Sequence, residues 1–175
     1  MSMDASSASA AEGAPVGVGE MKLEGVVLPV ADVDRAKEFY ESLGWRLDAD
    51  FAAGDDFRLI QMTPPGSSCS IQFGKNLTAA EPGSIGDIHV AVADVEATRE
   101  ELARRGVEVS EVYHCTNGIA CRYRDVGRLL PGAGLDGREG GRDPGGASYS
   151  SFASFSDPDG NGWVLQEITE RLPGR

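Results

Sequence analysis

The sequence predicts an α+β fold built from two copies of a β-α-β-β-β unit, and two observations support this. The chain repeats at an offset of 62 residues: Val30–Val33 (VADV) recurs at 92–95, and 34–47 aligns with 96–109. Six of these eighteen aligned positions are identical, and the hydrophobic positions are retained, which indicates two structurally equivalent modules. In both copies a short β-branched run precedes a segment with the spacing of an amphipathic helix.

In the first copy, residues 23–30 are expected to form a strand because they are rich in valine and leucine. Asp32 stands where a helix N-cap belongs, apolar residues recur with helical spacing over 33–43, and Gly44 follows as a stop. Residues 45–51, 57–63 and 69–73 are expected to be three further strands. They are separated by turns at 53–54 and 64–66.

The second copy follows the same order. A strand is expected at 88–92, a helix capped by Asp94 at 95–105, a stop at Gly106 and a strand at 107–112. The last two strands, at 149–155 and 163–168, are expected to form a hairpin. Residues 116–148 carry many glycines and arginines and are interpreted as an inserted loop, either a functional lid or a disordered segment.

Composition limits the domain organisation and the partners. Residues 1–20 are expected to be a disordered tail. Residues 21–169 are expected to be one domain with modules 21–80 and 81–169, followed by a tail at 170–175. With 16 basic and 28 acidic residues the net charge is −12, which disfavours nucleic acid and anionic membranes as partners. No apolar run approaches the ~20 residues needed to span a bilayer. The three cysteines form no CxxC pair, so a reducing cytoplasm is the expected location.

The two units, the segments FYESLGW (39–45) and RRGVEV (104–109), and the closing FSDPDGNGWVLQEI (155–168) resemble the vicinal oxygen chelate superfamily. That superfamily includes glyoxalase I, extradiol dioxygenases and bleomycin-resistance proteins. The resemblance implies that the two curled mixed sheets form a cup. It also implies that many members are homodimers, with the site within one chain or across two, and that enzymatic members hold a divalent metal through His or Glu.

The resemblance places the family's metal positions on residues that are poor donors here. The first-strand position falls on Gly25 and, 62 residues later, on Asp87. The last-strand positions fall on Gln72 and near Gln166, with Glu167 as the alternative because neighbours in a strand point to opposite faces. Such a set contains no imidazole or thiolate, so we expect no metal cofactor, with a divalent metal disfavoured.

His89 is the candidate catalytic residue, because it lies two residues after Asp87 and therefore on the same face of its strand. It could act as a general base, as a ligand-binding imidazole or as a displaced metal ligand, or it could be a structural histidine. Trp163 is expected to line the ligand cavity. The segment 157–162 (DPDGNG) matches half of a calcium loop, but position twelve holds Ile168, so a hairpin turn is expected.

Besides a regulatory or scaffold role with an empty cup, two functions remain open from the sequence. The first is a metal-independent small-molecule binder of the bleomycin-resistance type, which would sequester a drug or metabolite. Its cup would be formed by Gly25, Gln72, Asp87, His89, Trp163, Gln166 and Glu167. The alternative is a divergent enzyme of the same superfamily, a lyase, isomerase or dioxygenase that uses Asp87 and His89.

Overall fold

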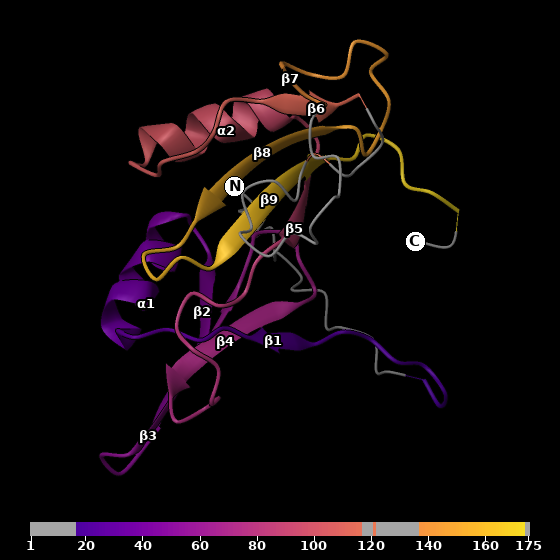
Figure 1. Cartoon of the computed structure of the whole chain (residues 1–175). Coiled ribbons are helices and arrows are strands. Elements are labelled where there is room, and N and C mark those ends of the chain that lie inside the picture. The colour runs from indigo at the N-terminus through magenta and orange to yellow at the C-terminus, as the bar shows by residue number, and fades with distance from the viewer. Residues whose placement is uncertain (1–16, 117–120, 122–136, 174–175) are drawn as a thin grey trace, which may run out of the picture.

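The computed structural model describes residues 17–116, 121 and 137–173 (Figure 1). The first module contains β1 (Gly25–Val27), α1 (Val33–Ser42), β2 (Arg46–Ala53), β3 (Phe57–Thr63) and β4 (Ser70–Lys75). The second contains β5 (Ile88–Val92), α2 (Val95–Arg104), β6 (Tyr113–Cys115), β7 (Arg138–Gly140), β8 (Ser151–Ser156) and β9 (Gly162–Glu167).

Each module folds its strands into one mixed sheet. The first sheet has the order β1-β4-β3-β2 and the second has the order β5-β9-β8-β6-β7. In each sheet the first strand runs parallel to the last strand of the module, β1 with β4 and β5 with β9, while the remaining pairs are antiparallel. The α+β fold predicted from the sequence is therefore confirmed, and the two sheets remain separate rather than closing into a barrel.

Two expectations for the second module are corrected. The strand expected at 107–112 is reduced to a single bridge between Val109 and Phe155, and regular pairing begins only at Tyr113. The expected insertion contains the short strand β7, which adds to the free edge of β6. The segment interpreted as a lid or a disordered loop also includes residues 117–120 and 122–136, which lie outside the described residues. The same is true of residues 1–16 and 174–175 in the expected tails.

The predicted helix boundaries hold because the capping residues act as expected. The Asp32 carboxylate accepts hydrogen bonds from the backbone N–H groups of Asp34 and Arg35, and the Asp94 carboxylate accepts one from Ala97. Gly44 and Gly106 follow the two helices with φ of 81° and 86°. This left-handed conformation favours glycine, which explains why both helices end there. Among the described residues, no helix has the length and apolar character needed to cross a bilayer.

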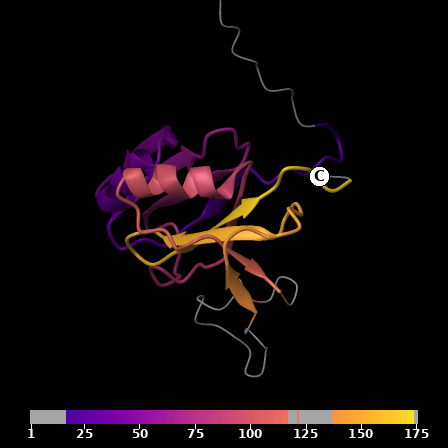
Figure 2. The ribbon, with the colours of Figure 1, turned by 90° about the horizontal axis from the view of Figure 1, so that it is seen from above.

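One hydrophobic core joins the two modules. Both helices lie on the same side of the molecule (Figure 1), and the helix-facing sides of both sheets contribute to a single cluster. Tyr40 of α1 contacts Trp45 and Phe73 of its own module and Trp163 of the other, with ring centroids 4.9–5.9 Å apart. Figure 2 shows α2 along one side of β8 and β9, with β7 projecting on the opposite side. The faces of the sheets that point away from this core are therefore the ones left for a ligand.

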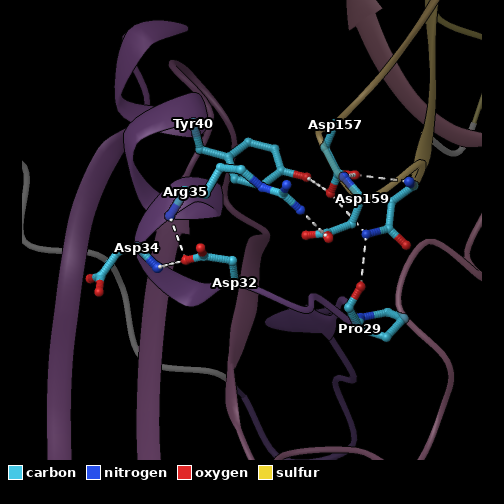
Figure 3. A network of polar contacts seen from close by, with 8 residues as sticks. Pro29, Asp32, Asp34, Arg35, Tyr40, Asp157 and Asp159 are labelled. Atoms are coloured by element: carbon cyan, nitrogen blue, oxygen red, sulfur yellow. Dashed lines mark hydrogen bonds and ion pairs between the residues drawn. The ribbon is translucent and has the colours of Figure 1, made fainter.

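A buried polar network, consisting of Tyr40, Asp157, Asn161 and the Pro29 carbonyl, links the hairpin between β8 and β9 to the first module (Figure 3). The Tyr40 hydroxyl and the Asn161 amide both donate to Asp157 Oδ2, at 2.9 and 2.8 Å. The same amide nitrogen donates to the Pro29 carbonyl oxygen at 3.0 Å. Beside the network, Arg35 forms an ion pair with Asp159 at 2.6 Å. Burial, and secondarily the Asp157 carboxylate, raise the pKa of Tyr40 well above its usual value, which keeps the hydroxyl a donor.

This network explains why the segment 157–162 (DPDGNG) carries its aspartates, glycines and asparagine. Asp157 Oδ1 accepts the backbone N–H groups of Asp159 and Asn161 at 3.0 and 2.8 Å, so both carboxylate oxygens are used within the protein. Gly160 has φ of 98°, as expected for a glycine-dependent turn. The structure therefore supports the interpretation as a hairpin turn, and the half match to a calcium loop has a structural explanation.

Candidate functional site

A groove of about 830 Å³ lies on the open face of the second sheet, at the end nearest the β8–β9 hairpin. The bridge between Val109 and Phe155 places Glu108 and Ser110 on the face away from the helices, beside Ser154. The loop that leads into β5 provides the opposite wall. The lining residues are 83–87, 108–110, 154–157, 160 and 162–164. The groove thus combines serine hydroxyls, carboxylates and the Val164 side chain.

Asp87 reaches the groove through an uncommon backbone conformation. Its φ is 59°, in the left-handed region, where aspartate is tolerated better than most residues other than glycine. Asp87 Oδ1 lies 3.1 Å from His89 Nε2. The positive φ is the kind of local strain that often accompanies functional sites, and here it occurs directly before β5.

His89 is fixed by contacts at both of its ring nitrogens. Nδ1 lies 3.1 Å from Gln166 Oε1, and Nε2 lies 3.1 Å from Asp87 Oδ1. Gln166 donates through Nε2 to the Tyr149 carbonyl oxygen at 3.0 Å, so its own oxygen is the atom that faces the imidazole. Both ring nitrogens therefore face acceptors, and neither is available to a substrate in this conformation. The predicted Asp87–His89 pair is brought together, and Gln166 rather than Glu167 joins it.

Two residues expected in the cup lie on the helix-facing side instead. The side chain of Glu167 is only 3% exposed. Its Oε2 accepts the backbone N–H of Val95 at 3.0 Å, and its Oε1 accepts Arg142 Nη2 at 2.6 Å. The backbone of Trp163 borders the groove, but its indole packs in the core and donates to the Tyr40 hydroxyl at 3.2 Å. The strict alternation of side chains in β9 places both residues opposite Val164 and Gln166.

Gly25 and Gln72 form a separate group on the first sheet. Gln72 donates through Nε2 to Gln61 Oε1 at 3.1 Å, and Gln61 donates in turn to Ser70 Oγ at 3.2 Å. A Cβ atom at Gly25 would lie 3.4 Å from Gln72 Nε2, so the glycine lies directly beside this amide. Within the described part of the chain, no hydrogen bond joins Gln72 and its neighbours on the first sheet to His89, Asp87 or Gln166 on the second. The expected cup residues other than Glu167 and Trp163 therefore form two sets, one on each sheet.

The sheet register also corrects the equivalence between the two modules. Gln72 pairs with Val27, and Val164 pairs with His89. Val27 and His89 are themselves separated by the repeat offset of 62 residues. The counterpart of Gln72 is therefore Val164, not Gln166.

The family's metal positions are thus Gly25, Gln72, Asp87 and Val164, and this set does not fit a divalent transition metal. It has one carboxylate, one amide and no imidazole or thiolate, whereas such metals take several nitrogen, sulfur or carboxylate ligands. The residues that the structure describes also include no group of three or more His, Cys, Asp or Glu arranged around a common point.

A second apolar cluster, which sequence reasoning missed, lies on the same open face as the groove. It consists of Tyr113, Cys121, Phe152 and Val164, with Cys115 packed against it. Cys121 is disulfide-bonded to Cys115, which leaves Cys69 as the free cysteine. The absence of a CxxC pair gave no sign of this disulfide, whose two Cα atoms lie 5.5 Å apart. The cytoplasmic location loses this support and stays a prediction.

With this geometry established, comparison with known proteins is informative. A family model, the Glyoxalase/Bleomycin resistance protein/Dioxygenase superfamily, matches residues 22–165. The chain belongs to this superfamily. The resemblance inferred from the sequence is thereby confirmed. The fold alone does not define the activity, since one architecture can carry different chemistries.

Solved structures of this superfamily support the same fold. TnmS3, an antibiotic binding protein from Streptomyces sp. CB03234, is 26% identical with a TM-score of 0.58, covering 86% of this chain and 98% of that one. A glyoxalase/bleomycin resistance protein from the same organism is 26% identical with a TM-score of 0.55, covering 83% and 100%. A superfamily member from Sphaerobacter thermophilus DSM 20745, 21% identical with a TM-score of 0.55, covers 85% and 98% and shows the fold alone. No curated protein matches the chain.

Proposed function

We propose that this superfamily member binds a small molecule, such as an antibiotic or metabolite, in the groove on its second sheet, without a metal. The observation that carries the proposal is the arrangement at His89. Both ring nitrogens lie 3.1 Å from a partner, Gln166 or Asp87, so the imidazole is held in one orientation beside Asp87, which lines the groove. A preorganised polar wall beside an apolar surface is typical of a binding site.

Three further observations support the binding role. The groove volume of about 830 Å³ suits a drug-sized molecule. Two of the four family metal positions are a glycine and a valine, whose side chains have no donor atom for a metal. One similar structure is that of an antibiotic binding protein. The enzymatic alternative, a lyase, isomerase or dioxygenase, would require one nitrogen of His89 to be released when a substrate binds.

We further propose that the protein is a homodimer whose ligand site lies between two chains. The helix-facing sides of both sheets share one core, so the opposite faces carry separate halves of the expected cup. The open side of the first module also exposes Leu23, Val27 and Phe51, which a second copy would cover. Light scattering should then give a mass of twice 18.4 kDa, whereas a monomer at micromolar concentration would contradict the shared site.

The binding role predicts stabilisation by at least one compound in a panel of antibiotics and aromatic metabolites. A ligand present at 100 times its Kd adds about 2.7 kcal/mol to the free energy of unfolding, which corresponds to roughly 5–10 °C in Tm. His89→Ala should weaken binding of that compound about tenfold, since it removes a partner that positions Asp87 at the groove. Asp55→Ala, an exposed change in the other module, should leave the affinity unchanged. Equal affinities for the wild type and the His89→Ala variant would contradict the assigned site.

A further inference from the structure

The first sheet carries a row of hydrogen-bonded polar side chains that runs from Gln72 to Asp48. Gln72 donates to Gln61, and Gln61 donates to Ser70, as described above. Ser70 Oγ lies 2.7 Å from Thr63 Oγ1, and the Thr63 hydroxyl donates to Asp48 Oδ2. Ser70 and Thr63 are 5% and 4% exposed, so the middle of this polar row is shielded from water. The groove on the second sheet uses none of its members.

Asp48 fixes the direction of the hydrogen bonds in the polar row. The Arg46 guanidinium, and secondarily the Thr63 hydroxyl, hold the pKa of Asp48 below its usual value, so this carboxylate is ionised and only accepts. The single hydroxyl hydrogen of Thr63 therefore goes to Asp48, and Ser70 must donate to Thr63. Ser70 Oγ must then accept an N–H from the Gln61 amide.

The other end of the polar row therefore holds the Gln72 amide in one orientation. Because the Gln61 nitrogen is used for Ser70, the Gln61 oxygen faces Gln72, and the Gln72 nitrogen must be the donor between them. Within the described residues, Gln72 Oε1 has no hydrogen-bond donor. It is not one of the buried side-chain atoms that lack a partner in that part of the chain, so it is accessible to solvent. Gln72 thus presents an unused acceptor.

The surroundings of Gln72 suit an apolar ligand. A Cβ atom at Gly25 would lie 3.4 Å from Gln72 Nε2 and 3.5 Å from Cδ, so glycine leaves this side of the amide uncovered. Val27 pairs with Gln72 and is 37% exposed. Phe51, which is 58% exposed, pairs with Leu59 on the same sheet. A hydrogen-bonding group fixed within an apolar surface is how small-molecule sites select and orient a ligand.

We infer that Gln72 is a specificity-determining residue that selects apolar small molecules carrying a carboxamide N–H, which donates to Gln72 Oε1. Since the polar row fixes this oxygen, a ligand N–H is matched there, whereas an ester oxygen at the same place would meet another acceptor. Asp48 is a positioning residue, because it acts through the row. The role of Gln72 in a ligand site shared by both sheets rests on the proposed function, but its preference for a donor does not.

The test compares two probes of the same shape, N-methylbenzamide and methyl benzoate, which differ in having an N–H or an ester oxygen. Binding to the full-length chain is followed by heteronuclear NMR of its glutamine side-chain amides. N-methylbenzamide should bind at least about fivefold more tightly and shift the Gln72 amide signal, which is assigned by its loss in Gln72→Leu. Gln72→Leu should bind both probes equally. Asp56→Ala, the control, alters a side chain that is 96% exposed and should keep the wild-type ratio.

Asp48→Asn tests whether the polar row sets the preference. Asparagine can donate as well as accept, so the Thr63 hydroxyl is no longer forced to point at it and the amides of Gln61 and Gln72 are free to turn. The preference for N-methylbenzamide should fall below about twofold, while thermal unfolding stays cooperative. A merely structural row would change the Tm and leave the ratio between the two probes as it is in the wild type.

Four results would overturn the inference. They are no binding of either probe, equal binding of both by the wild type, a preference that survives in Gln72→Leu, and an undiminished preference in Asp48→Asn. If the probes are distinguished as expected but no panel compound stabilises the protein, the proposed function fails while the preference of Gln72 stands. If a panel compound binds and depends on His89 but the probes are not distinguished, the proposed function stands and this inference fails.

Discussion

Replacing Asp157 with alanine is expected to lower the free energy of unfolding by about 3–5 kcal/mol, the largest loss we predict for a single substitution. The carboxylate accepts four hydrogen bonds, from the Tyr40 hydroxyl, the Asn161 amide and the backbone N–H groups of Asp159 and Asn161. Alanine would remove the acceptor of all four donor groups, and the Asn161 amide would keep its other hydrogen bond, to the Pro29 carbonyl oxygen. Because the network joins the last hairpin to the first module, the contact between modules would weaken as well.

Thermal and urea-induced unfolding followed by circular dichroism would measure this loss. For a chain of this size, 3–5 kcal/mol corresponds to a Tm about 10 °C lower. Asp56→Ala is the matched control, since that side chain is 96% exposed and its removal should change stability by less than about 0.5 kcal/mol. A Tm for Asp157→Ala within ~2 °C of the wild type would show that the network contributes little to the contact between modules.

Glu167→Ala is expected to lower the free energy of unfolding by about 2–4 kcal/mol. The carboxylate caps the N-terminus of α2 through the Val95 N–H and pairs with Arg142, and its side chain is almost fully buried. Loss of the acceptor leaves the buried Val95 N–H without this partner and leaves Arg142 with only its longer ion pair, to Glu96 at 3.9 Å, among the carboxylate contacts of the described residues. Glu167→Gln keeps an acceptor for Val95 and should lose about half as much.

Unfolding measurements on these variants also distinguish two placements of Glu167. On the helix-facing side, where the structure has it, its removal changes stability and leaves ligand affinity unchanged. Glu111→Ala serves as the control, because that carboxylate pairs with Arg99 at the surface and is largely exposed. If Glu167→Ala kept its stability but lost ligand binding, Glu167 would belong to the ligand site instead.

The sequence was sufficient for the fold class because its signals are local or repeated. Asp32 and Asp94 cap the helices, Gly44 and Gly106 end them, and the 62-residue repeat predicts two similar sheets. Family membership follows from the motifs in the same segments. The strand boundaries were less predictable: 107–112 carries a valine-rich pattern, but only Val109 makes a strand contact, because β6 begins later.

The candidate site was only partly predictable, because contacts distant in sequence decide it. Alternation in β9 shows that Gln166 and Glu167 face opposite ways but not which one faces His89. Their contacts decide this. Gln166 contacts Tyr149 and His89 on one face of β9, and Glu167 contacts Val95 and Arg142 on the other. Likewise, a spacing of six residues between two cysteines does not reveal whether they pair. The serines of the groove give no sequence signal beyond period-two alternation in β8.

The central claim is that the groove binds a small molecule without a metal. The most direct test is calorimetric titration of chelator-treated protein with the compound from the panel that gives the largest rise in Tm. The account predicts saturable binding at the same affinity before and after chelation, with metal content well below one per chain. If binding disappears on chelation and returns with added zinc, manganese or iron, the account is contradicted.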